Sequence, residues 1–104
     1  MEPQDKMKQM LAQLWEQHRS AIEGRVDVIQ SACDAIERGT LTVEQRELAH
    51  SAAHKLAGVL GTFGRSEGTD LARIFETWFA DTHELASHSA ELQSTLTALK
   101  AKIS

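Results

Sequence analysis

The sequence has one cysteine, one proline and no tyrosine. The lone Cys33 cannot form an internal disulfide, which favours a reducing, cytoplasmic setting. No apolar run approaches the roughly 18 residues that suggest a membrane span. The opening segment, MEPQDKMKQM, has no apolar centre and is not expected to be a signal peptide.

Basic charge is not in excess, since the formal net charge is -4. That balance argues against nucleic acid or a membrane as the main partner.

The amino-acid composition indicates one soluble helical domain. The 104 residues are 41% hydrophobic and 25% charged, a globular composition long enough for one modest core. Alanine, leucine, glutamate, glutamine and lysine are frequent, and all are strong helix formers. No segment alternates in the manner of a strand. We therefore predict an all-α fold and a single domain over residues 1–104.

The first predicted helix is long, from Asp5 to Arg38, and Gly39 is expected to end it. Apolar side chains, with His18 among them, recur in it at steps of three and four residues, as on one face of a helix. These positions are Met7, Leu11, Leu14, His18, Ile22, Val26, Ile29, Cys33 and Ile36. A helix of this length needs partners along its whole face.

Three more helices are predicted after it. The second begins at Thr42, whose hydroxyl can pair with Gln45 in a capping box. Its core face is expected to carry Leu48, Ala52, Leu56, Val59 and Phe63.

Ser66 is the predicted N-cap of the third helix, and Asp81 with Glu84 forms a capping-box candidate before the fourth. The core positions of these two helices are Leu71, Ile74, Phe75, Trp78, Leu85, Leu92, Leu96, Leu99 and Ile103. Short connections favour an antiparallel four-helix bundle with the long helix at its N-terminus.

The stretch SAAHKLAGVLGTFG, residues 51–64, combines a histidine with three glycines. At about 100° per residue, His54 lies about 160° from both Ala52 and Leu56, so it faces away from the core. His50 and Gly58 lie one turn to either side of it, and Gly61 is close to the same face. The outer surface of this helix is therefore a histidine followed by a groove without side chains.

A groove of this kind has a physical use, because glycine lets another backbone or a bulky group on the histidine come close. A neutral imidazole near physiological pH is also a competent nucleophile. Lys55 supplies a positive charge beside it. No GxxxxGK[ST] or GxGxxG loop is present to hold a nucleotide. Of the three glycines, Gly58 is expected to clear space, Gly61 to ease packing and Gly64 to end the helix.

The segments AHKLAGVLGTFG and GTDLARIFE resemble the histidine-containing phosphotransfer (HPt) domain of two-component phosphorelays. The matching positions are His54, Leu56, Gly58, Gly61, Gly64 and the pair Phe75-Glu76. The stretch GTFG is most like the phosphotransfer domain at the front of chemotaxis histidine kinases. The sequence departs from the family at Ala57, where many members have lysine or another polar residue.

The resemblance implies a four-helix bundle in which His54, on the second helix, exchanges a phosphoryl group with a receiver aspartate. Residues for phosphoryl stabilisation or receiver docking would be Lys55, Gly58, His50, Gly61 and Arg65. The expected partners are receiver domains or a hybrid histidine kinase, and a monomer is expected. Such a chain is a phosphocarrier rather than an enzyme. It binds no cofactor of its own, and Mg²⁺ is expected on the receiver.

Other interpretations remain open from the sequence. The chain could be a helical adaptor whose glycine groove docks a partner without phosphoryl chemistry. His50 and His54 have the spacing of a metal pair, but the other candidate ligands are scattered, so no metal site is predicted. Those scattered residues are His18, Cys33, His83 and His88.

Several other residues have plain structural interpretations. Arg65 could simply favour the helix C-terminus electrostatically. Trp15, Trp78 and His18 are expected at the core or its boundary, and Cys33 is expected to pack as a small apolar residue. A solvated acidic face is expected for Glu16, Glu23, Asp27 and Glu37.

Overall fold

Four α-helices and one 3-10 helix make up the computed structural model, which describes residues 3–80 and 85–103. In chain order they are α1 (Pro3–Arg38), α2 (Val43–Thr62), α3 (Ser66–Phe79), the 3-10 helix η1 (Leu85–His88) and α4 (Ser89–Ile103). Residues 3–80 and 85–103 contain no strand, and the predicted all-α bundle is confirmed. The predicted capping box of Asp81 and Glu84 lies outside the described residues.

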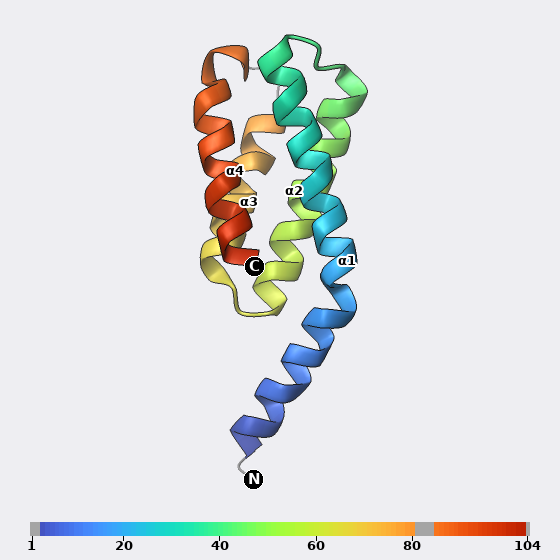
Figure 1. Cartoon of the computed structure of the whole chain (residues 1–104), viewed down its shortest axis with the longest axis vertical. Coiled ribbons are helices and arrows are strands. Elements are labelled where there is room, and N and C mark those ends of the chain that lie inside the picture. The colour runs from blue at the N-terminus through green and yellow to red at the C-terminus, as the bar shows by residue number, and fades with distance from the viewer. Residues whose placement is uncertain (1–2, 81–84, 104) are drawn as a thin grey trace.

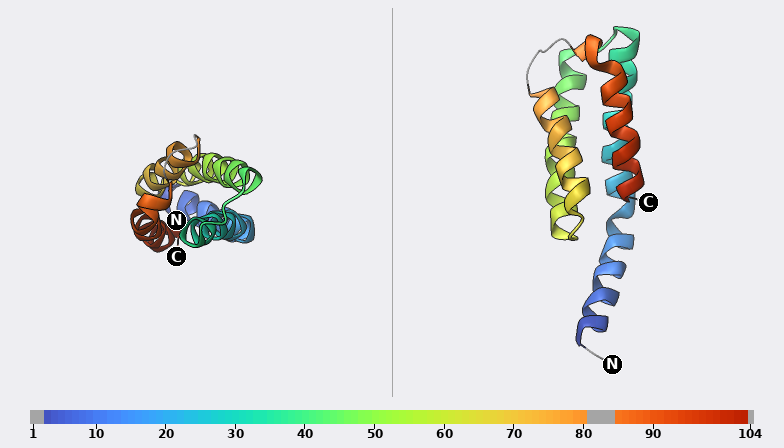
Figure 2. Two further views of the ribbon diagram at one scale, coloured as in Figure 1. Left: turned by 90° about the horizontal axis from the view of Figure 1, so that it is seen from above. Right: turned by 90° about the vertical axis from the view of Figure 1, so that its left-hand side faces the viewer.

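The helices are arranged as two antiparallel pairs. Helices α2 and α3 form a tight hairpin, and α4 lies beside the upper part of α1 (Figures 1 and 2). Seen from above, the helices surround a common centre. The molecule measures 54 × 20 × 19 Å because α1 continues far below the other helices.

Local signals set most helix ends. Gly39 and Gly64 both have φ of +72°, the left-handed conformation that glycine adopts freely. The amides of Thr40 and Arg65 then donate to the carbonyls of Ala35 and Leu60, which closes each helix in a Schellman motif. The capping box at the start of α2 is confirmed, with both Thr42–Gln45 hydrogen bonds present.

The predicted start of α3 is wrong by one residue. Arg65, not Ser66, is the N-cap, and no side chain caps the helix. The turn after Gly64 already aims the Arg65 carbonyl along the helix axis, where it accepts from the Thr69 amide at 3.0 Å. Ser66 is therefore the first helical residue. In the last helix, the predicted Leu85 is buried as expected but belongs to η1.

The core lies between all four helices, and its largest fully buried side chains include Phe75 and Phe79 of α3 and Leu56 and Leu60 of α2. Two predicted core residues are instead exposed: Leu48 by 63% and Ile74 by 42%. Each lies about 40° outward from a residue that does pack, Ala52 and Trp78 respectively. An apolar stripe in the sequence does not show how much of a helix's circumference the neighbouring helices cover.

The stripe on α1 is only half covered. From Trp15 to Ile36 its apolar residues are buried, whereas Met7, Leu11 and Leu14 are exposed. His18, predicted at the core or its boundary, is exposed and not in the core; its ring lies 6.2 Å from that of Phe63, at the bundle's lower edge. Within the described chain, α1 does not find partners along its whole face.

Polar side chains fix α1 against α4. Gln93 donates to the Asp34 carboxylate at 3.1 Å, and Gln30 donates to the same oxygen at 2.8 Å. These two hydrogen bonds favour the ionised form and hold the pKa of Asp34 below its usual range. Lys100 in turn donates to Gln30. The network sets the register between the first and last helices.

Cys33 is buried in the core, as predicted, and is 1% exposed. Burial, with a smaller effect of Asp34, raises the pKa of its thiol from 9.0 to about 12. The folded chain disfavours the thiolate. The contribution of the neutral Cys33 thiol to the free energy of unfolding is therefore complete below pH 9 and is lost as the pH rises through about 12.

Native Cys33 is therefore expected to resist thiol reagents at pH 8, because the thiolate is the reactive form and the side chain is buried. In denaturant it should react at the rate of a free cysteine. Absorbance-monitored titration with a disulfide reagent measures both rates. Equal rates in the two conditions would contradict this burial.

No helix in the described ranges is long and apolar enough to cross a membrane.

Candidate phosphotransfer site

His54 lies in the middle of α2 on its outer side. Ala53, Leu56 and Ala57 turn inward and are buried, which fixes the rotation of the helix. The His54 side chain is 68% exposed as a result. His50, one turn earlier, is half-buried, and Lys55 is exposed on the adjacent side. The prediction that His54 faces away from the core is therefore confirmed.

Glu76 of α3 holds the histidine ring. Its Oε2 lies 2.5 Å from His54 Nδ1, and its side chain is only 22% exposed. Phe75 and Phe79 are buried to one side of Glu76 around α3, so Glu76 lies at the edge of the buried face, where it reaches α2. An ionised carboxylate only accepts hydrogen bonds, so in the neutral ring this contact favours the tautomer with the proton on Nδ1, in which Nε2 keeps its lone pair. The outward nitrogen is thus the nucleophilic one.

A cation also lies beside this pair. Arg73, one turn before Glu76 on α3, has its Nη1 3.9 Å from Glu76 Oε1, and its side chain is 61% exposed. Glu76 was not predicted as the partner of His54, and Arg73 was not predicted as part of the site. The motif GTDLARIFE contains both residues, three apart, and that spacing was the available signal.

The three glycines have different surroundings. A Cβ added at Gly58 would meet nothing within 4 Å, so the surface one turn after His54 is open. At Gly61 an added Cβ would lie 3.6 Å from Thr69 Oγ1, an ordinary contact, so close packing does not require this glycine. The tight position is Gly68 of α3, where an added Cβ would lie 3.1 Å from Leu60 Cδ1.

Ala57, where the sequence departs from the family pattern, lies in the contact between α2 and α3. It is 2% exposed, and its carbonyl accepts a hydrogen bond from Thr69 Oγ1 at 3.2 Å. A lysine at this position would have to leave the α2–α3 contact to reach the histidine. Lys55 and Arg73 are the basic side chains near His54 that the surface does present.

Arg65 lies far from His54, about 16 Å along the axis at 1.5 Å per residue. Its guanidinium stacks 3.7 Å from the centre of the Trp15 ring and donates to the Lys102 carbonyl at 2.8 Å. Trp15 meets Phe63 edge-on at 5.2 Å. Arg65 therefore joins α1 and α4 at the lower end of the bundle, apart from the other predicted site residues.

The histidines do not gather into a metal centre in the described part of the chain. Over 3–80 and 85–103, no three side chains of histidine, cysteine, aspartate or glutamate converge. His88 packs instead against Trp78, with the ring centres 4.6 Å apart. His83 lies outside the described residues.

The fold and the site define a class of protein: a helical bundle whose surface histidine is oriented, through Nδ1, by a carboxylate of the neighbouring helix. The chain belongs to the Hpt domain family, whose sequence model matches residues 6–103. Protein RcaC of Microchaete diplosiphon is 32% identical over 105 aligned positions, which cover 97% of this chain. The chain spans 16% of the length of RcaC. No solved structure matches the chain significantly.

Membership of this family supports a phosphotransfer role in two-component signalling. Hpt domains are phosphocarriers, and they interact with receiver domains and kinases.

Proposed function

We propose that His54 accepts a phosphoryl group at Nε2 from a receiver aspartyl phosphate and passes it to a second receiver. The observation that supports this most directly is the contact between His54 Nδ1 and Glu76 on an exposed ring. The Nε2 lone pair forms the N–P bond while the aspartyl O–P bond breaks. The bonding electrons leave on the aspartate, and the proton stays on Nδ1.

Charge on the phosphorylated ring is balanced within the site. With both nitrogens substituted the imidazole is cationic, and the Glu76 carboxylate lies against its Nδ1–H. The phosphoryl group brings about 1.5 to 2 negative charges at neutral pH. Arg73 and Lys55 are the cations that we propose to stabilise it, and His50 lies on the same face. Any Mg²⁺ would be held by the receiver.

Phosphate transfer from labelled receiver domains tests the proposal. The chain should acquire a phosphate that is labile in acid and stable in alkali, as expected for phosphohistidine. A panel of receivers is needed because the structure does not identify the natural partner. The proposal is overturned if the label is alkali-labile, or if no receiver labels the chain while the same receivers label another Hpt domain.

Glu76→Ala is expected to slow transfer about 10- to 100-fold without abolishing it. Loss of a hydrogen bond to a charged group is expected to raise the activation free energy of transfer by about 1.5–3 kcal/mol. Nitrogen NMR of the His54 ring should show one tautomer, protonated at Nδ1, in the parent and a mixture in the variant.

Glu67→Ala is the control for Glu76→Ala, because Glu67 is on the same helix but pairs with Lys102. An unchanged rate in Glu76→Ala, with an unchanged tautomer, would remove Glu76 from the mechanism.

Gly58→Gln is expected to separate stability from function. Because the Cβ site is open, losing a helix-interior glycine should raise the free energy of unfolding by up to about 1 kcal/mol. Transfer should nevertheless slow severalfold, because the new side chain occupies the space where a receiver must approach. Urea denaturation and the transfer assay measure the two effects.

Gly24→Gln is the matched control, because Gly24 is also exposed, in α1, with nothing within 4 Å of its Cβ site. It should gain similar stability and transfer at the parent rate. If Gly58→Gln transfers as fast as Gly24→Gln, the open surface at Gly58 plays no part in docking.

A further inference from the structure

The C-terminal end of α3 is joined to the beginning of α2 by one side chain. Phe79 is the last residue of α3, so its carbonyl has no partner within the helix. Arg46, in the first turn of α2, donates to this carbonyl from Nη1 at 2.7 Å. Its guanidinium therefore lies at a helix C-terminus, where the helix dipole favours a cation.

The rest of the Arg46 side chain is less well satisfied. The residue is half-buried, and its Nε is buried without a hydrogen-bond partner among the described residues. A buried N–H without a partner lowers the stability of a fold. The bond to the Phe79 carbonyl is thus the main polar contact that this arginine provides in the described chain.

A second bond from a side chain to a carbonyl joins the same two helices near the α2–α3 turn. Thr69 Oγ1 of α3 donates to the Ala57 carbonyl of α2 at 3.2 Å. The contact between His54 and Glu76 lies between these two bonds on both helices. The order along α2 is Arg46, His54, Ala57, and the order along α3 is Thr69, Glu76, Phe79.

The position of α3 along α2 decides whether Glu76 meets His54. Their atoms are 2.5 Å apart. A shift of α3 by about 1 Å along its axis, less than the rise of one residue, can lengthen this contact to about 3.5 Å, outside the usual hydrogen-bond range. Hydrophobic burial is non-directional, so it resists such a shift less than a hydrogen bond to a backbone carbonyl does. Phe79 is about one turn from Glu76, so the bond to Arg46 is the nearer of the two.

We propose that Arg46 is a positioning residue for phosphotransfer. By holding the Phe79 carbonyl it keeps the last turn of α3, and with it Glu76, level with His54. Arg46 itself contacts neither the histidine nor the phosphoryl group, and it acts only through Glu76. This inference rests on the proposed function of His54.

Nitrogen NMR of the neutral His54 ring tests the positioning directly. In Arg46→Met the proton population should shift from Nδ1 toward the mixture expected for Glu76→Ala. Arg46→Gln should give the same shift, because its amide is two bonds shorter and cannot reach the Phe79 carbonyl. Two variants keep the test valid if one of them does not fold, which circular dichroism reports.

A double-mutant cycle tests whether Arg46 acts through Glu76. Arg46→Met alone should slow phosphate transfer about 3- to 10-fold, less than Glu76→Ala, because the Glu76 side chain can still reach the ring part of the time. Added to Glu76→Ala, the same substitution should change the rate by less than about twofold. Equal slowing in both backgrounds would show a general loss of structure or a direct contact with the receiver, and would overturn the proposal.

Gln93→Met is the control for loss of a hydrogen bond between helices. Gln93 donates to Asp34 at 3.1 Å and lies in the α1–α4 pair, away from the α2–α3 hairpin (Figure 2). This variant should keep the parent tautomer and the parent rate of transfer.

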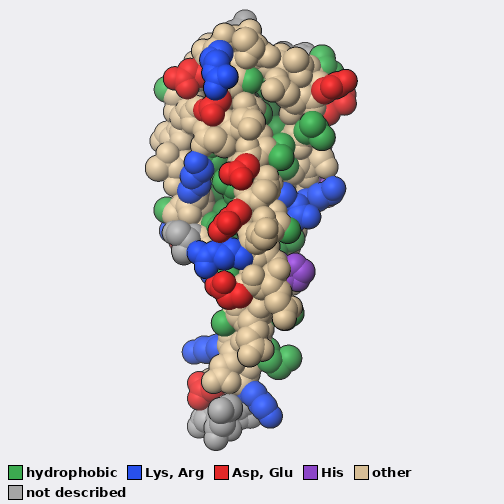
Figure 3. Space-filling view, turned by 45° about the vertical axis from the view of Figure 1, so that its right-hand side comes forward, with side chains coloured by type: hydrophobic (Ala, Val, Ile, Leu, Met, Phe, Trp, Pro, Cys, Tyr) green, Lys and Arg blue, Asp and Glu red, His purple; other side chains and the backbone are tan. Residues whose placement is uncertain are grey.

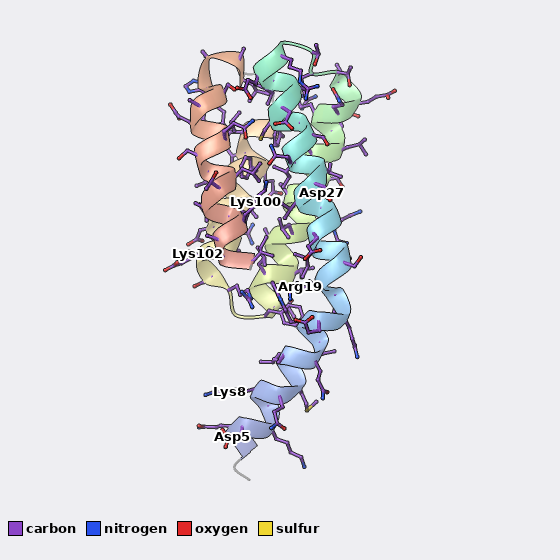
Figure 4. All side chains as sticks on the ribbon, viewed as in Figure 1. Asp5, Lys8, Arg19, Asp27, Lys100 and Lys102 are labelled. Carbon is purple, nitrogen blue, oxygen red and sulfur yellow. The ribbon has the colours of Figure 1, made fainter. Side chains whose placement is uncertain are left out.

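Lys8→Met is the control for loss of one positive charge. Lys8 is exposed on the part of α1 that projects below the bundle (Figure 4). Charged side chains of both signs lie on that narrow part (Figure 3). Lys8→Met should also keep the parent tautomer and rate.

The parent tautomer in both folded Arg46 variants would overturn the proposal. So would the same change of tautomer in Gln93→Met. The NMR measurement needs no receiver, so it decides the placement of Glu76 by Arg46 even if no receiver phosphorylates the parent chain. Absence of phosphorylation would instead contradict the function proposed for His54.

Discussion

Replacing His54 with glutamine is expected to abolish phosphorylation of the chain. Glutamine has an amide that can still contact Glu76, so the surface keeps its shape and hydrogen-bonding capacity. The amide nitrogen, however, has no free lone pair, and no nucleophile remains at the position of Nε2. We expect the transfer rate to fall by on the order of a thousandfold or more, below detection in a labelled assay.

His50→Gln is the control for this result. His50 is one turn before His54 on the same side of α2, at a separation of about 6 Å between Cβ atoms. It is half-buried and has no role as acceptor in the mechanism. This variant should still be labelled, and both variants should have the far-ultraviolet circular dichroism of the parent. Label on His54→Gln, or its loss only in His50→Gln, would show that the acceptor has been assigned to the wrong residue.

Phe75→Ala is expected to destabilise the fold by about 3–5 kcal/mol. Phe75 is fully buried and stacks on Phe79 with ring centres 6.1 Å apart, so truncation leaves a cavity between α3 and its neighbours. Domains of this size have total stabilities of only about 5–15 kcal/mol. Urea denaturation followed by circular dichroism should show a much lower midpoint, and transfer should fall because Glu76 is the next residue.

The adjacent residue provides the comparison. Ile74 is 42% exposed, and Ile74→Ala should change the free energy of unfolding by no more than about 0.5 kcal/mol. Two neighbouring truncations on one helix are thus expected to change the free energy of unfolding by very different amounts. A difference in helix propensity alone would not produce this. Equal destabilisation by both would mean that α3 is rotated from the orientation described.

Sequence reasoning succeeded where the signal is local. Gly39, Gly64 and the pair Thr42–Gln45 act within a few residues of themselves, and they set the helix ends that were predicted from them. His54 was oriented correctly because the inward residues around it are all small or apolar. The same logic failed for Leu48 and Ile74, whose exposure depends on how far neighbouring helices extend around each face.

The partner of His54 could not be derived from spacing alone. Glu76 is 22 residues away, and the two side chains meet only because α3 packs against α2 at one particular rotation. That rotation follows from burial of Phe75 and Ala72 together with the hydrogen bond from Thr69 to Ala57. The contact of Arg65 with Trp15 could not be predicted for a similar reason, because it joins segments 50 residues apart in the sequence.

The α2–α3 hairpin has a consequence for how the chain acquires its site. The histidine, its carboxylate partner and the nearby arginine all lie between Val43 and Phe79, on two helices joined by a turn of only a few residues. Closing so short a connection costs little chain entropy compared with bringing α4 back to α1. Contacts that are local in sequence form early, so we expect this hairpin to act as the folding nucleus. Mutations that weaken it would slow folding, whereas mutations between α1 and α4 would mainly speed unfolding.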